Sequence, residues 1–456
     1  MARPDYPYAP HLDLVEQLHG HAVADPYRWL EDADSPETAV WSAAQDRLVR
    51  THLDELPGRD RLAARLGELL ATGLISAPAW RDGRAFWLRR EPGQEHGAVW
   101  TSGPSGSERL LLDPIALDPT GATTLDAWAP SKEGTRLAYQ LSVGGDEESL
   151  LRVLDVETGA VLDGPVDRCR YSPVAWLPGG QELFYVRRLP ADQVPPGQAQ
   201  FHRRVWRHRV GTPTDDDVMI WGEGLDPTNY YSCSVSADGR WLVVSASAGT
   251  APRDDVWLFD LSIGGPPASV QVGVDARCSA WVAHDGRLWL LTDRDAPRGR
   301  LCVADPLSPT VWTTVLTEDP EAVLEDVALL EDDIVVALRN RHALSEITVH
   351  QGDLATPVAV PGPGSCSGLS SLPTGGSRVW FGWTDATTPP QVRHLDAPTG
   401  TVTLWQDSPG RVSLESVVAT VLEVVSADGT TVRAQVLSPA GTADRPRPTV
   451  LYGYGG

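Results

Sequence analysis

Short apolar segments alternate with tight polar turns along most of the chain. In residues 281–291, two apolar runs flank Asp285-Gly286, a pair that favours a hairpin turn because glycine adopts positive φ without steric cost. The same arrangement of strand, turn and strand recurs seven times. Its turns lie at residues 82–83, 133–134, 179–180, 238–239, 285–286, 332–333 and 375–376. The alternation predicts a mainly β chain built from repeated hairpins.

The spacing of these copies predicts a seven-bladed β-propeller. Gly83 and Gly134 are 51 residues apart, and Gly239 and Gly286 are 47 apart; a propeller blade occupies about 40–50 residues. A second hairpin follows each copy, so each unit supplies four strands. An all-β sandwich is the alternative, but the regular period argues against it. Because the first unit begins with its own inner strand and the last ends with its own outer strand, we expect an open ring closed by packing.

The residues before the repeats predict two helices. Ser35 and Pro36 form a helix start, with the serine as N-cap and the proline at the first helical position. This helix should continue past Leu48 and end near residues 56–58, and a second should cover residues 61–70. Residues 19–32 are dense in aromatic and charged side chains with little periodicity. We expect them to form an extended segment that packs on another domain.

After Gln406 the repeat stops and the pattern changes. Residues 421–437 predict a hairpin around Asp428-Gly429, and residues 449–452 predict a buried strand that runs into the glycine-rich residues 453–456. This order is typical of the start of an α/β-hydrolase domain. The expected domains are an N-terminal extension (1–72), a seven-bladed propeller (73–411) and an incomplete hydrolase domain (412–456).

Composition narrows the partners and the compartment. The formal net charge of −23 argues against binding to nucleic acid or anionic membranes. The five cysteines fit neither a disulfide framework nor a zinc site, and no apolar run is long enough to span a membrane. We therefore expect a soluble protein in a reducing cytoplasm, without metal or cofactor. Tryptophan recurs at one position of the repeat (Trp80, Trp128, Trp176 and Trp281), as a packing residue between blades would.

Three segments of the sequence resemble motifs of the prolyl oligopeptidase family of serine peptidases. They are residues 19–32, residues 205–213 and residues 451–456. The resemblance implies a propeller that caps an α/β-hydrolase domain, with the N-terminal segment packed on the hydrolase. It also implies cleavage of short peptides after proline by a Ser-Asp-His triad between the domains, and exclusion of large folded proteins by the propeller. We expect a monomer whose partners are short proline-containing peptides.

The resemblance assigns roles to two tyrosines. Tyr454 would donate its hydroxyl to the oxyanion of the tetrahedral intermediate, a role in which one donor stabilises the transition state by about 3–4 kcal/mol. Tyr171 would reach from the propeller toward bound peptide, although an ordinary core aromatic is an equal alternative. Cys366 lies at the nucleophile position of a phrase similar to Gly-Xaa-Ser-Xaa-Gly, but no helix pattern follows it, and we expect no catalysis there.

Two functions remain open from the sequence. In the first, the chain is the N-terminal part of a prolyl oligopeptidase-like serine endopeptidase, cut by an incomplete gene model or a frameshift. It would then be inactive alone, because the triad would lie beyond Gly456. In the second, the chain is a non-catalytic propeller that binds a peptide or protein partner. The first is favoured because the sequence stops inside a hydrolase-like motif.

Overall fold

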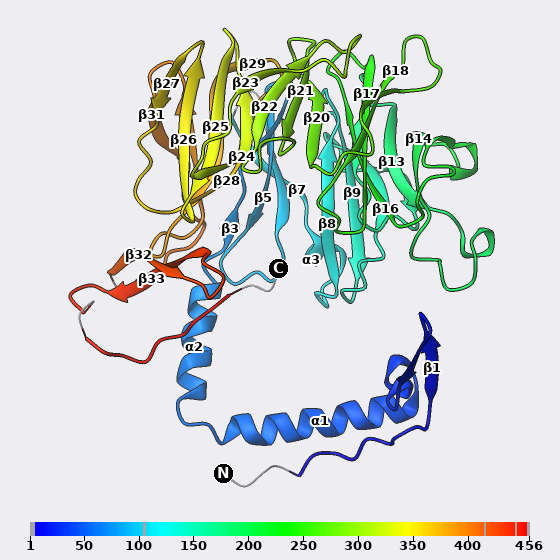
Figure 1. Cartoon of the computed structure of the whole chain (residues 1–456), viewed down its shortest axis with the longest axis vertical. Coiled ribbons are helices and arrows are strands. Elements are labelled where there is room, and N and C mark those ends of the chain that lie inside the picture. The colour runs from blue at the N-terminus through cyan, green and yellow to red at the C-terminus, as the bar shows by residue number, and fades with distance from the viewer. Residues whose placement is uncertain (1–4, 104–105, 415, 443–444, 454–456) are drawn as a thin grey trace. The chain divides into compact units, whose positions relative to one another are not determined.

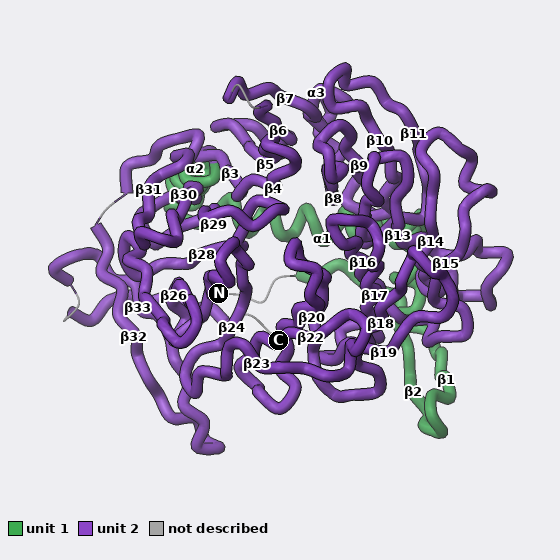
Figure 2. The backbone as a smooth tube through the Cα atoms, turned by 90° about the horizontal axis from the view of Figure 1, so that it is seen from above, with its two compact units in different colours: residues 1–70 green, residues 71–456 purple. Residues whose placement is uncertain are grey.

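Antiparallel hairpins dominate the computed structural model, as the alternation predicts (Figure 1). The structure describes residues 5–103, 106–414, 416–442 and 445–453. Contacts divide the chain into two compact units, residues 1–70 and residues 71–456 (Figure 2). Each unit has its own secondary structure.

The first unit begins with a hairpin that was not predicted. β1 (Val15–Leu18) pairs with β2 (His21–Ala24) in antiparallel register, and the short helix η1 (Arg28–Glu31) follows. His19 and Gly20 connect the strands with φ of 51° and 82°. Positive φ at both central residues matches the twist of a two-residue hairpin. The expected extended conformation is therefore found at His21–Ala24, whereas residues 28–31 form a short helix instead.

The two predicted helices are confirmed. α1 (Pro36–Asp54) starts where expected, because the hydroxyl of Ser35 accepts a hydrogen bond from the Thr38 backbone N–H at 3.1 Å. The cap satisfies one of the free N–H groups of the first turn. α2 (Arg59–Leu70) starts two residues earlier than predicted.

Among its described residues, the second unit contains seven sheets of four or five consecutive strands, arranged as blades around an axis, and one separate hairpin (Figure 2). The first three blades are β3 (Leu74–Ile75), β4 (Ala79–Arg81), β5 (Arg84–Arg90), β6 (Ala98–Ser102) and β7 (Glu108–Leu112); β8 (Thr123–Pro130), β9 (Arg136–Val143), β10 (Leu150–Asp155) and β11 (Val161–Val166); β12 (Val174–Trp176), β13 (Glu182–Arg188), β14 (Arg203–Arg209) and β15 (Val218–Trp221). Short helices lie at α3 (Pro114–Leu117), η2 (Ala191–Gln193) and η3 (Thr214–Asp216).

The remaining four blades repeat the same order. They are β16 (Asn229–Val235), β17 (Trp241–Ala248), β18 (Asp255–Asp260) and β19 (Ala268–Gln271); β20 (Cys278–Val282), β21 (Leu288–Thr292), β22 (Arg300–Ala304) and β23 (Thr313–Leu316); β24 (Ala322–Leu329), β25 (Ile334–Arg341), β26 (Leu344–Gln351) and β27 (Leu354–Pro357); β28 (Ser365–Leu372), β29 (Gly375–Thr384), β30 (Gln391–Asp396) and β31 (Thr401–Gln406). The predicted seven-bladed propeller is confirmed.

Two local features explain irregular copies of the repeat. In the first blade, β3 and β4 both pair with β5, so the innermost strand is interrupted between Ile75 and Ala79. In the sixth copy, which lacks a turn glycine, Asp332 and Asp333 adopt φ of 56° and 55°. Aspartate tolerates this left-handed region better than most residues. The turn therefore survives without glycine.

The core of the propeller lies between adjacent blades. Phe184 of the third blade packs with Leu242 and Val244 of the fourth, and all three are fully buried. Trp176 also bridges two blades, because its indole N–H donates to the carbonyl of Ala129 at 2.9 Å. Each blade thus buries its faces against its neighbours.

The ring is open, as predicted. No strand of the first blade pairs with the last within the sheets that the structure describes. The two blades instead pack through aromatic rings: the centroids of Trp80 and Trp380 are 4.8 Å apart, and those of Trp87 and Trp405 are 5.7 Å apart. A hydrogen bond from Gln406 to Glu108 at 2.5 Å joins their outer strands. Side-chain contacts therefore close the ring, and one backbone hydrogen bond, from the Gly410 N–H to the Thr72 carbonyl at 2.8 Å, joins its two ends.

Beyond the propeller, the predicted hairpin is confirmed but the predicted strand is not. β32 (Val417–Val425) and β33 (Thr431–Pro439) form a separate two-stranded sheet. Residues 449–452 adopt no strand, and Val450 and Leu451 are 93% and 92% exposed. A strand needs a hydrogen-bonded neighbour, and none of the described residues provides one here.

Candidate functional site

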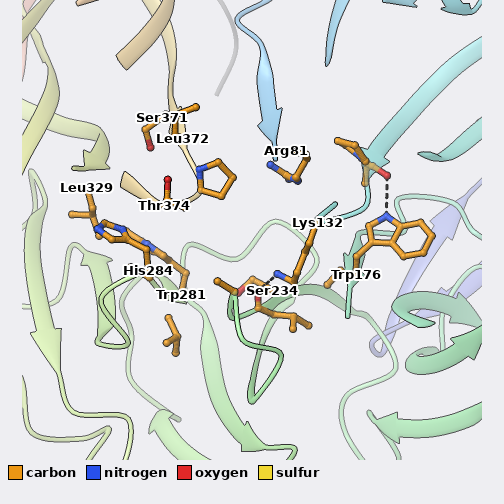
Figure 3. A pocket seen from close by; sticks show the side chains of 18 of the residues that line it. Arg81, Lys132, Trp176, Ser234, Trp281, His284, Leu329, Ser371, Leu372 and Thr374 are labelled. Atoms are coloured by element: carbon orange, nitrogen blue, oxygen red, sulfur yellow. Dashed lines mark hydrogen bonds between the residues drawn. The ribbon is translucent and has the colours of Figure 1, made fainter. Parts of the chain in front are cut away.

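The turns at the ends of the inner strands surround a cavity of about 790 Å³ on the propeller axis (Figure 3). All seven blades contribute to its lining. The lining side chains labelled in the figure are Arg81, Lys132, Trp176, Ser234, Trp281, His284, Leu329, Ser371, Leu372 and Thr374. The cavity therefore forms one mouth of the propeller's central channel; we call it the turn-side cavity.

Two cations line the turn-side cavity, and neither forms an ion pair with a carboxylate of the described residues. Arg81 Nη1 donates to the carbonyl of Trp80 at 2.6 Å, and Lys132 Nζ donates to the carbonyl of Val235 at 2.9 Å. Burial, together with the nearby Arg81 charge, lowers the pKa of Lys132 to about 8, although Glu133 acts to raise it. Burial also lowers the pKa of Arg81. For both groups, burial is the largest cause of the lowered pKa.

Glu133 supplies the opposite charge at the same mouth. Its Oε1 accepts a hydrogen bond from the Gly179 N–H at 2.6 Å, whereas its buried Oε2 has no hydrogen-bond partner in the described part of the chain. The indoles of Trp176 and Trp281 form apolar parts of the wall. The cavity thus combines cationic, anionic and aromatic groups.

Tyr171 lies away from the turn-side cavity. It precedes the inner strand β12, whereas the turn at that cavity follows β12, so Tyr171 is at the opposite end of the strand. Its φ is 55° and its side chain is 53% exposed, which excludes the alternative of a core aromatic. Its hydroxyl donates to Glu147 at 2.5 Å. This bond, followed by that from Arg170, holds the pKa of the Glu147 carboxyl below its ordinary value.

A second aromatic ring and several arginines accompany Tyr171. The Tyr171 and Tyr230 ring centroids are 6.0 Å apart, and the Arg203 guanidinium lies 3.9 Å from the centroid of the Tyr230 ring. Arg203 is only 3% exposed, and its Nε and Nη1 have no hydrogen-bond partner in the described residues. Burial lowers its pKa, and Arg188 and Arg170 add to that effect. We call Tyr171, Tyr230 and Arg203 the tyrosine cluster.

Two other candidate residues are Tyr454 and Cys366. Tyr454 lies outside the described residues. Cys366 is on β28, and burial raises the pKa of its thiol to about 12, so it is a poor nucleophile. The described residues contain no group of three or more His, Cys, Asp or Glu side chains placed to hold a metal ion. Among the described helices, none is long and apolar enough to cross a membrane.

Sequence reasoning missed Lys132, although a signal was present. Lys132 is the only lysine in the 456 residues. It lies at a repeat turn, where a charged residue is usually solvated, so its position alone gave no indication of a cavity. The arginine of the tyrosine cluster, Arg203, was not predicted as a site residue either, and the structure buries it on β14.

The fold and the axial cavity define a seven-bladed propeller with an open ring. Residues 7–408 match the family model described as "Prolyl oligopeptidase, N-terminal beta-propeller domain". The chain belongs to the prolyl oligopeptidase family.

Relatives and solved structures agree with this assignment. The chain is 27% identical over 459 aligned residues to a prolyl endopeptidase from Elizabethkingia meningoseptica, covering 99% of this chain but 64% of the relative. Protease 2 from Moraxella lacunata is 23% identical, over 98% of this chain and 66% of the relative. The chain therefore spans about two thirds of the length of these proteins.

A structure from a study of two prolyl endopeptidases matches with a TM-score of 0.87 at 29% identity, over 96% of this chain and 65% of that one. Prolyl oligopeptidase B from Galerina marginata, solved with a 35mer hydrolysis and macrocyclization substrate, has a TM-score of 0.84 at 20% identity, over 96% of this chain and 66% of that one. At 20% identity, the similarity to the Galerina marginata structure shows the fold alone.

Proposed function

We propose that this chain is the propeller part of a serine endopeptidase that hydrolyses short peptides after proline, and that it has no peptidase activity alone. The observation that carries the proposal is the family match over residues 7–408, together with relatives named prolyl endopeptidase. The sequence contains no Gly-Xaa-Ser-Xaa-Gly phrase, so a hydrolase domain would have to supply the nucleophile.

In this proposal the propeller limits the size of substrate. Seven inner strands surround the axis, and the ring is closed by side-chain packing between its first and last blades. Short peptides would pass such a structure, and folded proteins would not.

Tyr171 is the proposed peptide contact. Its exposed ring, beside that of Tyr230, offers an apolar face on which a proline ring can pack. The hydrogen bond to Glu147 and the Arg170 guanidinium, 5.0 Å from the ring centroid, would fix its orientation. Tyr454 remains the proposed oxyanion donor.

Residues 1–72 and 412–456 are proposed to belong with the hydrolase domain. The β32–β33 hairpin supports this because apolar side chains such as Val425 and Leu437 are 73% and 52% exposed. An isolated two-stranded sheet is at best marginally stable in water, and a hydrolase sheet would cover these groups. We also propose a cytoplasmic monomer, which agrees with five unpaired cysteines.

A proline-linked chromogenic dipeptide tests the proposal. We expect no turnover by this chain, and turnover by a polypeptide in which the chain is joined to a hydrolase domain encoded after it. Cys366→Ala should leave both results unchanged. If the joined polypeptide also fails to cleave while the chain binds peptides, the chain is instead a non-catalytic binding module, for which the turn-side cavity would be the recognition site.

A further inference from the structure

The turn-side cavity holds two incompletely bonded cations in a chain whose formal net charge is −23. Arg81 enters it from β4 and Lys132 from the loop after β8 (Figure 3). A lysine ammonium offers three N–H donors and a guanidinium five. Among the described residues each group makes one hydrogen bond, to a backbone carbonyl, and neither has a carboxylate at ion-pair distance.

We propose that the turn-side cavity binds a small oxyanion, either free phosphate or the carboxylate of an acidic peptide, between Arg81 and Lys132. Charge-assisted hydrogen bonds from both side chains would hold it. The cavity, at about 790 Å³, is larger than one such group, so the oxyanion can belong to a longer molecule. His284, Ser371 and Thr374 lie across the cavity from Lys132 and would face the rest of that molecule (Figure 3). This proposal is independent of peptidase activity.

Nearby carboxylates repel an oxyanion, so the removal of one of their negative charges should strengthen oxyanion binding. Asp82 and Glu133 line the cavity, and the charges of Glu133 and Asp238 act to raise the pKa of Lys132. Glu133→Gln removes one of these charges and keeps an oxygen that can accept from the Gly179 N–H. We therefore expect Glu133→Gln to tighten oxyanion binding, whereas Arg81→Gln and Lys132→Gln weaken it.

The protonation of Lys132 adds a pH dependence. The amine of the empty site has a pKa of about 8, and a bound oxyanion would raise it. Binding should thus be strongest below pH 8 and fall as the pH rises above that value, because the free protein then loses the proton that binding requires. The charged groups that act on the amine are Arg81, Glu133 and Asp238.

The single lysine makes the experiment direct. Biosynthetic labelling with ¹³C-lysine places the label at Lys132 alone, keeps its three N–H donors, and reports both ligand binding and pKa by NMR. Inorganic phosphate is titrated first, then an acetylated tetraglutamate amide, with the tetraglutamine amide as its neutral match. Sulfate, whose charge is constant, serves for the pH series.

We expect a saturable shift of this resonance and a raised Lys132 pKa with phosphate, with the glutamate peptide, or with both. Phosphate binding assigns a free anion, and binding of the glutamate peptide alone assigns a peptide carboxylate. Arg81→Gln should weaken binding by about tenfold or more, as the loss of a charge-assisted hydrogen bond implies. Arg84→Gln removes the same charge from a residue that does not line the cavity and pairs with Glu157 at 3.6 Å, so it is the matched control.

Three results would overturn the proposal. One is the absence of a saturable shift with either ligand. The second is equal weakening by Arg81→Gln and Arg84→Gln, which would indicate a general charge effect. The third is weaker binding by Glu133→Gln. This last variant gains affinity if the site exists, so a general loss of folding cannot imitate the expected result.

Discussion

His208 gives the sharpest prediction about stability, because both of its ring nitrogens contact carboxylates, one in its own blade and one across a blade boundary. Nδ1 lies 2.6 Å from Asp217 and Nε2 lies 2.8 Å from Asp163, while the His208 side chain is 2% exposed. Asp163 is on β11 of the second blade and His208 on β14 of the third. Two carboxylate acceptors require both nitrogens to donate, so the imidazole is protonated.

The pKa of His208 sets the size of the effect. Burial alone would lower it, but the hydrogen bonds to Asp163 and Asp217 outweigh burial and raise it from 6.5 to about 9. A shift of this size corresponds to about 3 kcal/mol. Because the folded-state pKa is raised, this stabilisation is fully present below pH 6.5 and is lost as the pH rises to about 9.

The assay is urea denaturation of the wild type and His208→Gln at pH 6 and pH 9.5. At pH 6 the variant should lose about 3–5 kcal/mol, the usual cost of breaking a buried ion pair. At pH 9.5 the difference should be about 3 kcal/mol smaller. Lys132 has the opposite dependence between pH 8 and 10.5, because its pKa is lowered, but its contribution cancels between the two proteins. An equal difference at both pH values would refute the reasoning.

Three further predictions concern the ring, the thiols and the tyrosine cluster. Trp380 is buried between the first and last blades, so Trp380→Ala should lower the free energy of unfolding by about 3–5 kcal/mol in the same urea assay. Leu404 is 47% exposed, so Leu404→Ala should lower it by less than about 1 kcal/mol. Equal losses in the two variants would contradict closure of the ring by packing. Burial raises the pKa of four thiols to about 12: those of Cys169, Cys233, Cys278 and Cys366. These thiols should react with a disulfide reagent at pH 8 only after the protein unfolds. Rapid labelling of the native protein would contradict this by showing that they are accessible. In the joined polypeptide, Tyr171→Ala should raise KM for a proline peptide by about tenfold. Tyr171→Phe loses only the hydrogen bond to Glu147 and should raise KM by a smaller factor. If KM is unchanged in both variants, Tyr171 does not contact the peptide.

Much of the fold follows from local sequence signals. The seven turns were visible because glycine or aspartate at positive φ marks each hairpin, and spacings such as the 51 residues from Gly83 to Gly134 and the 47 from Gly239 to Gly286 identified the blade. The Ser35-Pro36 start of α1 was equally clear, because both residues satisfy the first helical turn without tertiary contacts. The open ring followed from the strand content of the first and last copies.

The functional groups were harder to predict, because their properties depend on neighbours distant in sequence. Lys132 is buried and incompletely bonded only because the turns of other blades enclose it, and Val235, its one hydrogen-bond acceptor among the described residues, is 103 residues away in the sequence. Arg203 is buried by packing that its alternating strand pattern did not indicate. The prediction of a strand at residues 449–452 was wrong because it also depends on a distant neighbour. An apolar run forms a strand only where it can pair with the edge of another strand.

Size selection tests the central claim most directly. The joined polypeptide is given one proline-containing decapeptide in two forms, free in solution and placed in a surface loop of a folded host protein, and cleavage is followed by mass spectrometry. The account predicts that the free peptide is cut after proline, that the same sequence in the host is not cut, and that this chain alone cuts neither. Equal cleavage of both forms, or any cleavage by the chain alone, would contradict it.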